Sequence, residues 1–297
     1  MKSTDLKNKK ETKLIWLTAI LTFICVFAWN IIVNIVVQIY QVKKLGSMEA
    51  GKAFMDKLAS TNLPYQLLLI LGSEFIFLLI VYSLTKKYND GEFNFALIGL
   101  KAKEGNAKKL LLLGMGIASL MAIGLYGGLI AIGYAKVLDI GYVNCSALNI
   151  LVSVMVAFVV AAVVGFAEEV VFRGVILKYL LNRRGKVFAL VASSLIFTIG
   201  HVDRLSLNYL LQVFLLSIVL GYLYIITESL YLSIGVHIAW DFYSFLILED
   251  GKGTYAIKGV LNLHIPNPND TTFNISLIFM LLIVLIIAFM VNKRKTI

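Results

Sequence analysis

Ionisable side chains are rare inside the apolar stretches of this chain, but a group of them stands in its second half. The group comprises Glu168, His201, His237 and Asp241. Charged groups at membrane depth are costly, and they usually face a bundle interior or a water-filled cavity. Carboxylates and imidazoles take up and return protons, so this set could activate a water molecule for hydrolysis or form a proton relay.

The spacing of the group predicts that its members lie at a similar depth. Sixteen residues of helix from Glu168 to a following turn span about 24 Å, and seventeen residues from that turn to His201 span about 26 Å. His237 and Asp241 follow a later turn by ten and fourteen residues, which corresponds to about 15 and 21 Å of helix. We therefore expect all four side chains to meet below the cytoplasmic face of a membrane.

Two further spacings define the faces of single helices. Glu169 and Arg173 are four residues apart, so they share a face and can form an ion pair that fixes the helix. Glu168 is rotated by about 100° from Glu169 and can face elsewhere. His237 and Asp241 are also four residues apart, so the carboxylate can orient the imidazole or share a ligand with it.

Three short runs that contain these residues follow one another along the chain. They are Glu-Glu-Val-Val-Phe-Arg at 168–173, Phe-Thr-Ile-Gly-His at 197–201 and His-Ile-Ala-Trp-Asp at 237–241. They resemble the EExxxR, FxxxH and HxxxN or HxxxD motifs of the CPBP family of intramembrane proteases (CAAX protease and bacteriocin-processing, also called Abi). Each motif alone is weak, but three in order on successive hydrophobic segments are specific. The resemblance covers about 148–248.

The resemblance implies an endopeptidase that works inside the membrane. By similarity, Glu168 with His201 would activate the attacking water. His237 and Asp241 would stabilise the oxyanion or complete the site, while the paired Glu169 and Arg173 would support the helix.

Residue 241 departs from the best-known eukaryotic members, which carry asparagine there. An asparagine amide can donate a hydrogen bond to an oxyanion, whereas an ionised aspartate only accepts. Asp241 therefore fits better as a partner of His237, or as a metal ligand. Glu168, His201, His237 and Asp241 together could hold Zn²⁺ with one position open for water. Both a zinc-dependent and a metal-free, glutamate-dependent protease stay open.

Composition excludes a water-soluble domain. Of the 297 residues, 60% are hydrophobic and 15% are charged, against about 45–50% and 25% in ordinary soluble domains. Since about 20 apolar residues cross a bilayer as a helix, we expect an all-α, polytopic protein whose residues 1–297 form one integral-membrane domain. Its apolar runs predict eight transmembrane helices, at 14–40, 64–84, 110–134, 148–180, 187–200, 209–226, 230–248 and 273–291.

The net charge of +10 has its origin at the ends of these runs. Most of the 27 lysines and arginines fall on the side that holds both termini, which predicts cytoplasmic termini. No basic face with interleaved aromatic residues is apparent, so we expect the lipid bilayer and a peptide or membrane-protein substrate as partners, and no nucleic acid. The lysine- and asparagine-rich composition indicates a bacterial source, where such proteins serve peptide maturation and bacteriocin immunity.

Two other functions remain open from the residues alone. Buried carboxylates and histidines also serve ion- or proton-coupled transporters, although the two halves of this chain do not repeat each other. A non-catalytic immunity protein could keep the same fold. Glu74 is a further charged residue within an apolar run, but no motif includes it.

Overall fold

A computed structural model describes residues 2–101, 106–140, 146–202, 206–249, 260–266 and 271–293. Helices dominate these residues, as the composition predicts. The α-helices are α1 (Lys2–Leu45), α2 (Met48–Thr61), α3 (Leu63–Tyr88), α4 (Asn106–Ala131), α5 (Ala147–Glu169), α6 (Lys178–Leu181), α7 (Lys186–Ile199), α8 (Leu207–Thr227), α9 (Leu230–Leu246) and α10 (Thr271–Lys293). A 3₁₀ turn, η1 (Phe95–Ile98), precedes α4, and a π-helical segment, η2 (Val170–Leu177), joins α5 to α6.

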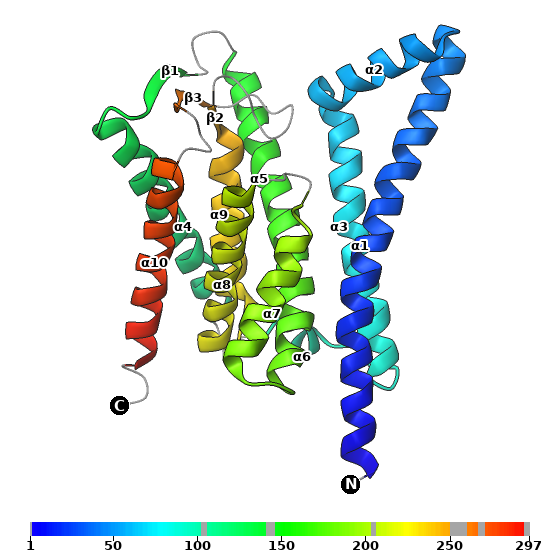
Figure 1. The fold of residues 1–297 in the computed structure, drawn as a ribbon, viewed down its shortest axis with the longest axis vertical. Coiled ribbons are helices and arrows are strands. Elements are labelled where there is room, and N and C mark those ends of the chain that lie inside the picture. Colours follow the sequence, from blue (N-terminus) through cyan, green and yellow to red (C-terminus); the bar gives the residue numbers. More distant parts are fainter. Residues whose placement is uncertain are drawn as a thin grey trace.

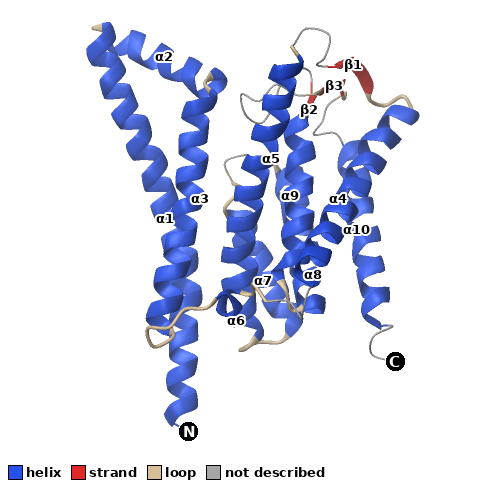
Figure 2. Cartoon of the chain, turned by 180° about the vertical axis from the view of Figure 1, so that it is seen from behind, coloured by secondary structure: helices blue, strands red, loops and turns tan. Residues whose placement is uncertain are grey.

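Three short strands lie together at one end of the bundle (Figure 2). They are β1 (Lys136–Ile140), β2 (Ile247–Glu249) and β3 (Leu261–His264), in the order β1-β3-β2. β1 is antiparallel to β3, and β2 is parallel to it. The sequence did not predict this small sheet, because each strand is too short to give a periodic pattern. It leaves the all-α membrane architecture unchanged.

Five helical segments are long and apolar enough to cross a membrane. They are Asn8–Leu45, Leu63–Tyr88, Asn106–Ala131, Ala147–Leu181 and Leu207–Thr227. Helices also occupy the three other predicted spans, but α7 has only 14 residues, α9 has 17, and the apolar part of α10 is short. The chain is thus a multi-pass membrane protein, and the count of eight spans stays a prediction.

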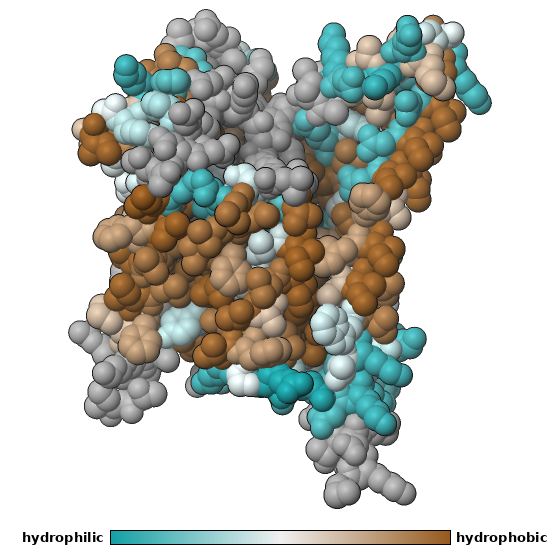
Figure 3. All heavy atoms as spheres, in the orientation of Figure 1, coloured by the Kyte–Doolittle hydropathy of each residue, from teal (hydrophilic) through white to brown (hydrophobic). Residues whose placement is uncertain are grey.

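The surface agrees with a bilayer setting. Apolar side chains form a band across the middle of the bundle, with hydrophilic residues gathered at both ends (Figure 3). α1 begins and α10 ends at the same end of the bundle (Figure 1). Which end faces the cytoplasm stays a prediction, and several basic residues that it uses lie outside the described residues, among them Lys103, Arg204 and Lys252.

α9 is tightly enclosed near the site. It packs against α4, α5 and α8, and every residue from Leu232 to Ala239 is buried. Glycines allow its close approach to α4, because a Cβ at Gly114 would overlap the Leu232 carbonyl and a Cβ at Gly235 would overlap the Leu111 carbonyl. The position of His237 is therefore fixed by backbone-to-backbone packing.

α1, α2 and α3 stand together at one side of the bundle (Figure 1). Polar residues at four-residue spacing on α1 contact α3. Asn30 Nδ2 donates to Ser73 Oγ at 3.3 Å, and Tyr65 donates its hydroxyl hydrogen to Asn34 Oδ1 at 2.6 Å. Hydrogen bonds of this kind join membrane helices where water cannot compete.

Candidate active site

The helix that carries the first motif changes its winding within that motif. α5 is a regular α-helix up to Glu169, and the chain continues as the π-helical segment η2, whose eight residues are all buried. π-helical insertions are rare and frequently mark functional sites. Here the wider turn contains Arg173 and packs Gly174 directly on the carbonyl of Ile98.

Glu169 and Arg173 form the ion pair that their spacing predicts. Arg173 Nη1 lies 2.6 Å from Glu169 Oε1, and the two side chains are 2% and 0% exposed. Arg173 Nη2 also donates to Ser217 Oγ at 3.0 Å and to the Ser217 carbonyl at 3.2 Å. The guanidinium carbon lies 4.6 Å from the centre of the Phe197 ring. These contacts satisfy a charge that would be very costly to bury alone.

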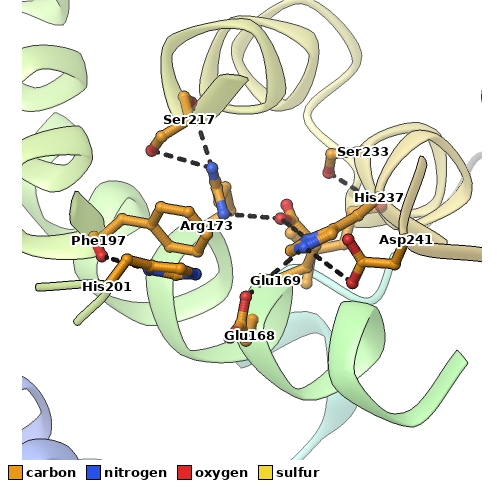
Figure 4. Close-up of polar contacts among 10 residues, drawn as sticks. Glu168, Glu169, Arg173, Phe197, His201, Ser217, Ser233, His237 and Asp241 are labelled. Carbon is orange, nitrogen blue, oxygen red and sulfur yellow. Dashed lines mark hydrogen bonds and ion pairs between the residues drawn. The ribbon is translucent and has the colours of Figure 1, made fainter. Parts of the chain in front are cut away.

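The same glutamate also holds His237. His237 Nδ1 lies 2.9 Å from Glu169 Oε1, so the carboxylate accepts a hydrogen bond from the protonated Nδ1. On the other side of the ring, Nε2 lies 3.5 Å from Glu168 Oε2 and 3.6 Å from Asp241 Oδ2. The carboxylate that orients the imidazole through Nδ1 is therefore Glu169, while Asp241 faces the other ring nitrogen, Nε2 (Figure 4).

His201 lies just past the end of α7, in a turn that follows Gly200. Its Nδ1 is 3.0 Å from the carbonyl oxygen of Phe197. Because that oxygen can only accept, Nδ1 carries the hydrogen and Nε2 is the free nitrogen. The imidazole also packs on the Phe197 ring, with 4.6 Å between ring centres.

One cavity of about 350 Å³ brings the four residues of the predicted group together. Glu168, His201, His237 and Asp241 all line it, from α5, the end of α7 and α9. α8 closes another side of the cavity and α10 adds two leucines. The cavity is large enough for water and a short stretch of substrate backbone.

A second cavity, of about 650 Å³, lies on the other side of Glu168 and His201. Both cavities are lined by Glu168, Gly200 and His201, so these residues form a shared wall. The second cavity is mostly apolar and extends to α1 and α3. Its further lining residues include Phe23, Phe27, Phe77 and Phe172.

The donor set does not form a ready-made metal site. Among the described residues, no group of three or more His, Cys, Asp or Glu side chains is placed to hold a metal ion. Zinc therefore enters no step below, and its presence stays a prediction for metal analysis.

Three residues near the motifs were missed by reasoning from the sequence. Ser217 completes the Arg173 site from α8, 44 residues away in the chain. Tyr209 and Gln212 line the cavity of about 350 Å³ from the same helix. Gln212 could have been noticed as a polar side chain in an apolar span, whereas nothing in the sequence relates Ser217 to Arg173.

Comparison with known families agrees with the geometry. Residues 150–243 match the family described as "Type II CAAX prenyl endopeptidase Rce1-like", and this stretch contains all three motifs. The resemblance to the CPBP family is thereby confirmed for this stretch. No curated protein matches the chain.

Proposed function

From the match of residues 150–243 to the Rce1-like family of CAAX-type endopeptidases, we propose that the chain is an intramembrane endopeptidase. It hydrolyses a peptide bond in a peptide or membrane-associated protein by means of a water activated by Glu168 and His201. The observation that carries the proposal is the single cavity within an apolar helix bundle that is lined by both residues together with His237 and Asp241.

In the proposed reaction, Glu168 takes one proton from water and later gives it to the leaving nitrogen. Glu168 accepts a proton from water while the free Nε2 of His201 accepts a hydrogen bond that holds the same water. The water oxygen attacks the carbonyl carbon of the scissile bond and forms a tetrahedral intermediate. Glu168 then returns the proton to the leaving nitrogen as the C–N bond breaks. Proton transfer by a positioned side chain contributes about 10²–10⁴-fold to such reactions.

Glu169 and Arg173 do not contact the substrate in this proposal and act by positioning His237. They hold the His237 ring through Nδ1, which keeps Nε2 directed toward Glu168 and Asp241. His237 and Asp241 thereby form the side of the cavity that belongs to α9. A fixed arrangement of this kind adds to the rate because no reorganisation is needed during the reaction.

The apolar second cavity supports a substrate with an apolar group next to the cleaved bond. Phenylalanine rings line it, and it reaches Glu168 and His201 directly. A lipid-modified or transmembrane segment can place its apolar part there while its backbone enters the polar cavity. A prenylated carboxyl-terminal peptide is one such substrate, which the description of the matched family names.

The proposal is tested by cleavage assays on the purified chain in detergent and in proteoliposomes. The probes are a farnesylated Cys-aliphatic-aliphatic-X peptide, its unprenylated twin, and a transmembrane peptide. Glu168→Gln and His201→Ala should each abolish cleavage while leaving the melting temperature within a few degrees. His264→Ala is the matched control, since His264 lies in β3 and is not among the residues that line either cavity.

The other two functions give different results in the same preparations. Ion-driven uptake into proteoliposomes without any peptide cleavage would support a transporter. Immunity in cells that persists in Glu168→Gln, again without cleavage, would support a non-catalytic protein.

A further inference from the structure

The cavity of about 350 Å³ that is lined by Glu168, His201, His237 and Asp241 is called the reaction cavity below. These four residues present hydrogen-bond acceptors to it and almost no hydrogen-bond donors. The carboxylates of Glu168 and Asp241 only accept hydrogen bonds when ionised. His201 has its hydrogen on Nδ1, against the Phe197 carbonyl, and His237 has one on Nδ1, against Glu169. In their neutral forms both rings therefore present a bare Nε2 to the cavity.

Protonation of His237 would not change this balance. A hydrogen on Nε2 would lie between Glu168 Oε2 at 3.5 Å and Asp241 Oδ2 at 3.6 Å. Both oxygens attract it more strongly than a neutral carbonyl does. A peptide carbonyl that becomes an oxyanion needs a donor aimed at it, and removal of such a donor costs about 10²–10³-fold in rate.

α8 places a polar face on the same cavity. Tyr209, Gln212, Val213 and Leu216 recur at the spacing of one helical face, and all four line the cavity. The Gln212 amide has no hydrogen-bond partner within the described part of the chain. Gln212 is half-buried and lines the cavity, so its amide makes no hydrogen bond that would stabilise the described bundle.

The remaining donors around the cavity are less suited to the task. The Ser244 hydroxyl donates to the Trp240 carbonyl at 3.0 Å, and Tyr209 already interacts with another residue. The Trp240 ring packs on the apolar cluster formed with α4 and α10. Its indole N–H is a competing donor to be tested.

We propose that Gln212 donates the hydrogen bond that stabilises the oxyanion during peptide hydrolysis. The proposal rests on the proposed protease function. It assigns a catalytic role to α8, a helix that carries none of the three motifs. The amide has two hydrogens, so it can bind a carbonyl oxygen and remain neutral throughout the reaction.

The test compares initial rates of cleavage of the fluorogenic farnesylated peptide by the unmodified full-length chain and four purified variants, Gln212→Ala, Gln212→Glu, Trp240→Phe and Glu168→Gln. Gln212→Ala should lower kcat by about 10²–10³-fold with KM within about threefold, because the oxyanion exists only in the transition state. Gln212→Glu, which keeps the size but adds an acceptor, should lower kcat at least as much. Trp240→Phe should keep kcat within about threefold.

The outcomes separate this proposal from the protease function itself. If Glu168→Gln abolishes cleavage while both Gln212 variants keep kcat within about threefold, the protease stands and the role of Gln212 is wrong. A loss confined to Trp240→Phe would likewise overturn it and transfer the role to the indole. Cleavage that survives Glu168→Gln would instead contradict the protease mechanism.

Discussion

His237 Nδ1 and Arg173 Nη1 both contact the same oxygen, Oε1 of Glu169, at 2.9 and 2.6 Å. One carboxylate atom thus joins the π-helical segment to α9. The two adjacent glutamates of the first motif have separate tasks in this arrangement. Glu168 lines the reaction cavity, whereas Glu169 is 0% exposed and holds the histidine from behind.

Glu169→Ala should strongly destabilise the protein. It leaves the buried Arg173 charge without its partner, and breaking one half of a buried ion pair typically costs about 3–5 kcal/mol. Thermal unfolding in detergent measures the effect. Glu228→Gln is the matched control, because the Glu228–Lys101 pair is exposed and exposed pairs contribute little. Equal melting temperatures of the two variants would contradict the role assigned to Glu169.

Arg173→Lys should lower both stability and activity, although the charge is kept. A lysine has one ammonium group and cannot contact Glu169, Ser217 and the Phe197 ring together as the planar guanidinium does. Ser217→Ala removes one of these contacts and should cost about 0.5–1.5 kcal/mol. The melting temperature should be highest for the unmodified chain, lower for Ser217→Ala and lowest for Arg173→Lys. A lysine variant as stable as the unmodified chain would show that the fork geometry is dispensable.

Gly114→Ala should destabilise the α4–α9 contact by about 1–3 kcal/mol, the usual cost of overpacking. Its Cβ would overlap the Leu232 carbonyl on α9, so α4 and α9 must separate, which disturbs the helix that carries His237. Gly116→Ala on the same helix is the control, since a Cβ there meets nothing within 4 Å. Melting temperature and cleavage rate are measured for both. Similar losses in the two variants would argue against close packing as the cause.

Glu74→Leu should keep or raise the melting temperature. Glu74 is 6% exposed, and its Oε2 has no hydrogen-bond partner among the described residues. The negative charge of Glu168 also acts on this carboxyl. An unsatisfied buried polar group costs about 1–3 kcal/mol, so an apolar side chain of similar size should relieve it. A marked fall in melting temperature would instead indicate that Glu74 has a stabilising partner.

Metal removal distinguishes the two mechanisms that stay open, because a glutamate-dependent reaction should continue unchanged without metal. Elemental analysis of the purified protein, followed by assays with chelator and with added Zn²⁺, measures this. Loss of activity on chelation that Zn²⁺ restores would establish the zinc-dependent alternative.

The sequence was sufficient for the long apolar helices and for the convergence of the four residues on one cavity, but it did not predict α2. Helical rise alone placed Glu168, His201, His237 and Asp241 at similar depth, because antiparallel membrane helices share a common frame. Lateral contacts between helices, in the plane of the membrane, were harder to predict. The hydrogen bond between His237 and Glu169 depends on how far α5 and α9 are rotated about their own axes. The spacing of residues within one helix does not determine that rotation.

The π-helical winding of η2 also could not be predicted from the sequence. Its residues Val170–Leu177 have the composition of an ordinary apolar helix. η2 packs on α1, α3 and α7, and no local sequence pattern records these contacts. Similarly, the Arg173–Ser217 contact joins segments 44 residues apart.

The wall that separates the two cavities has a consequence for inhibitor design. Consider a compound with an apolar group in the second cavity, beside α1 and α3, and a small polar group in the first cavity, beside α8. The two groups would meet at Glu168 and His201. In the proposed protease, a compound that carries both parts would block both the attacking water and the apolar binding site of the substrate. Its potency should therefore depend on the length of the link between the two groups.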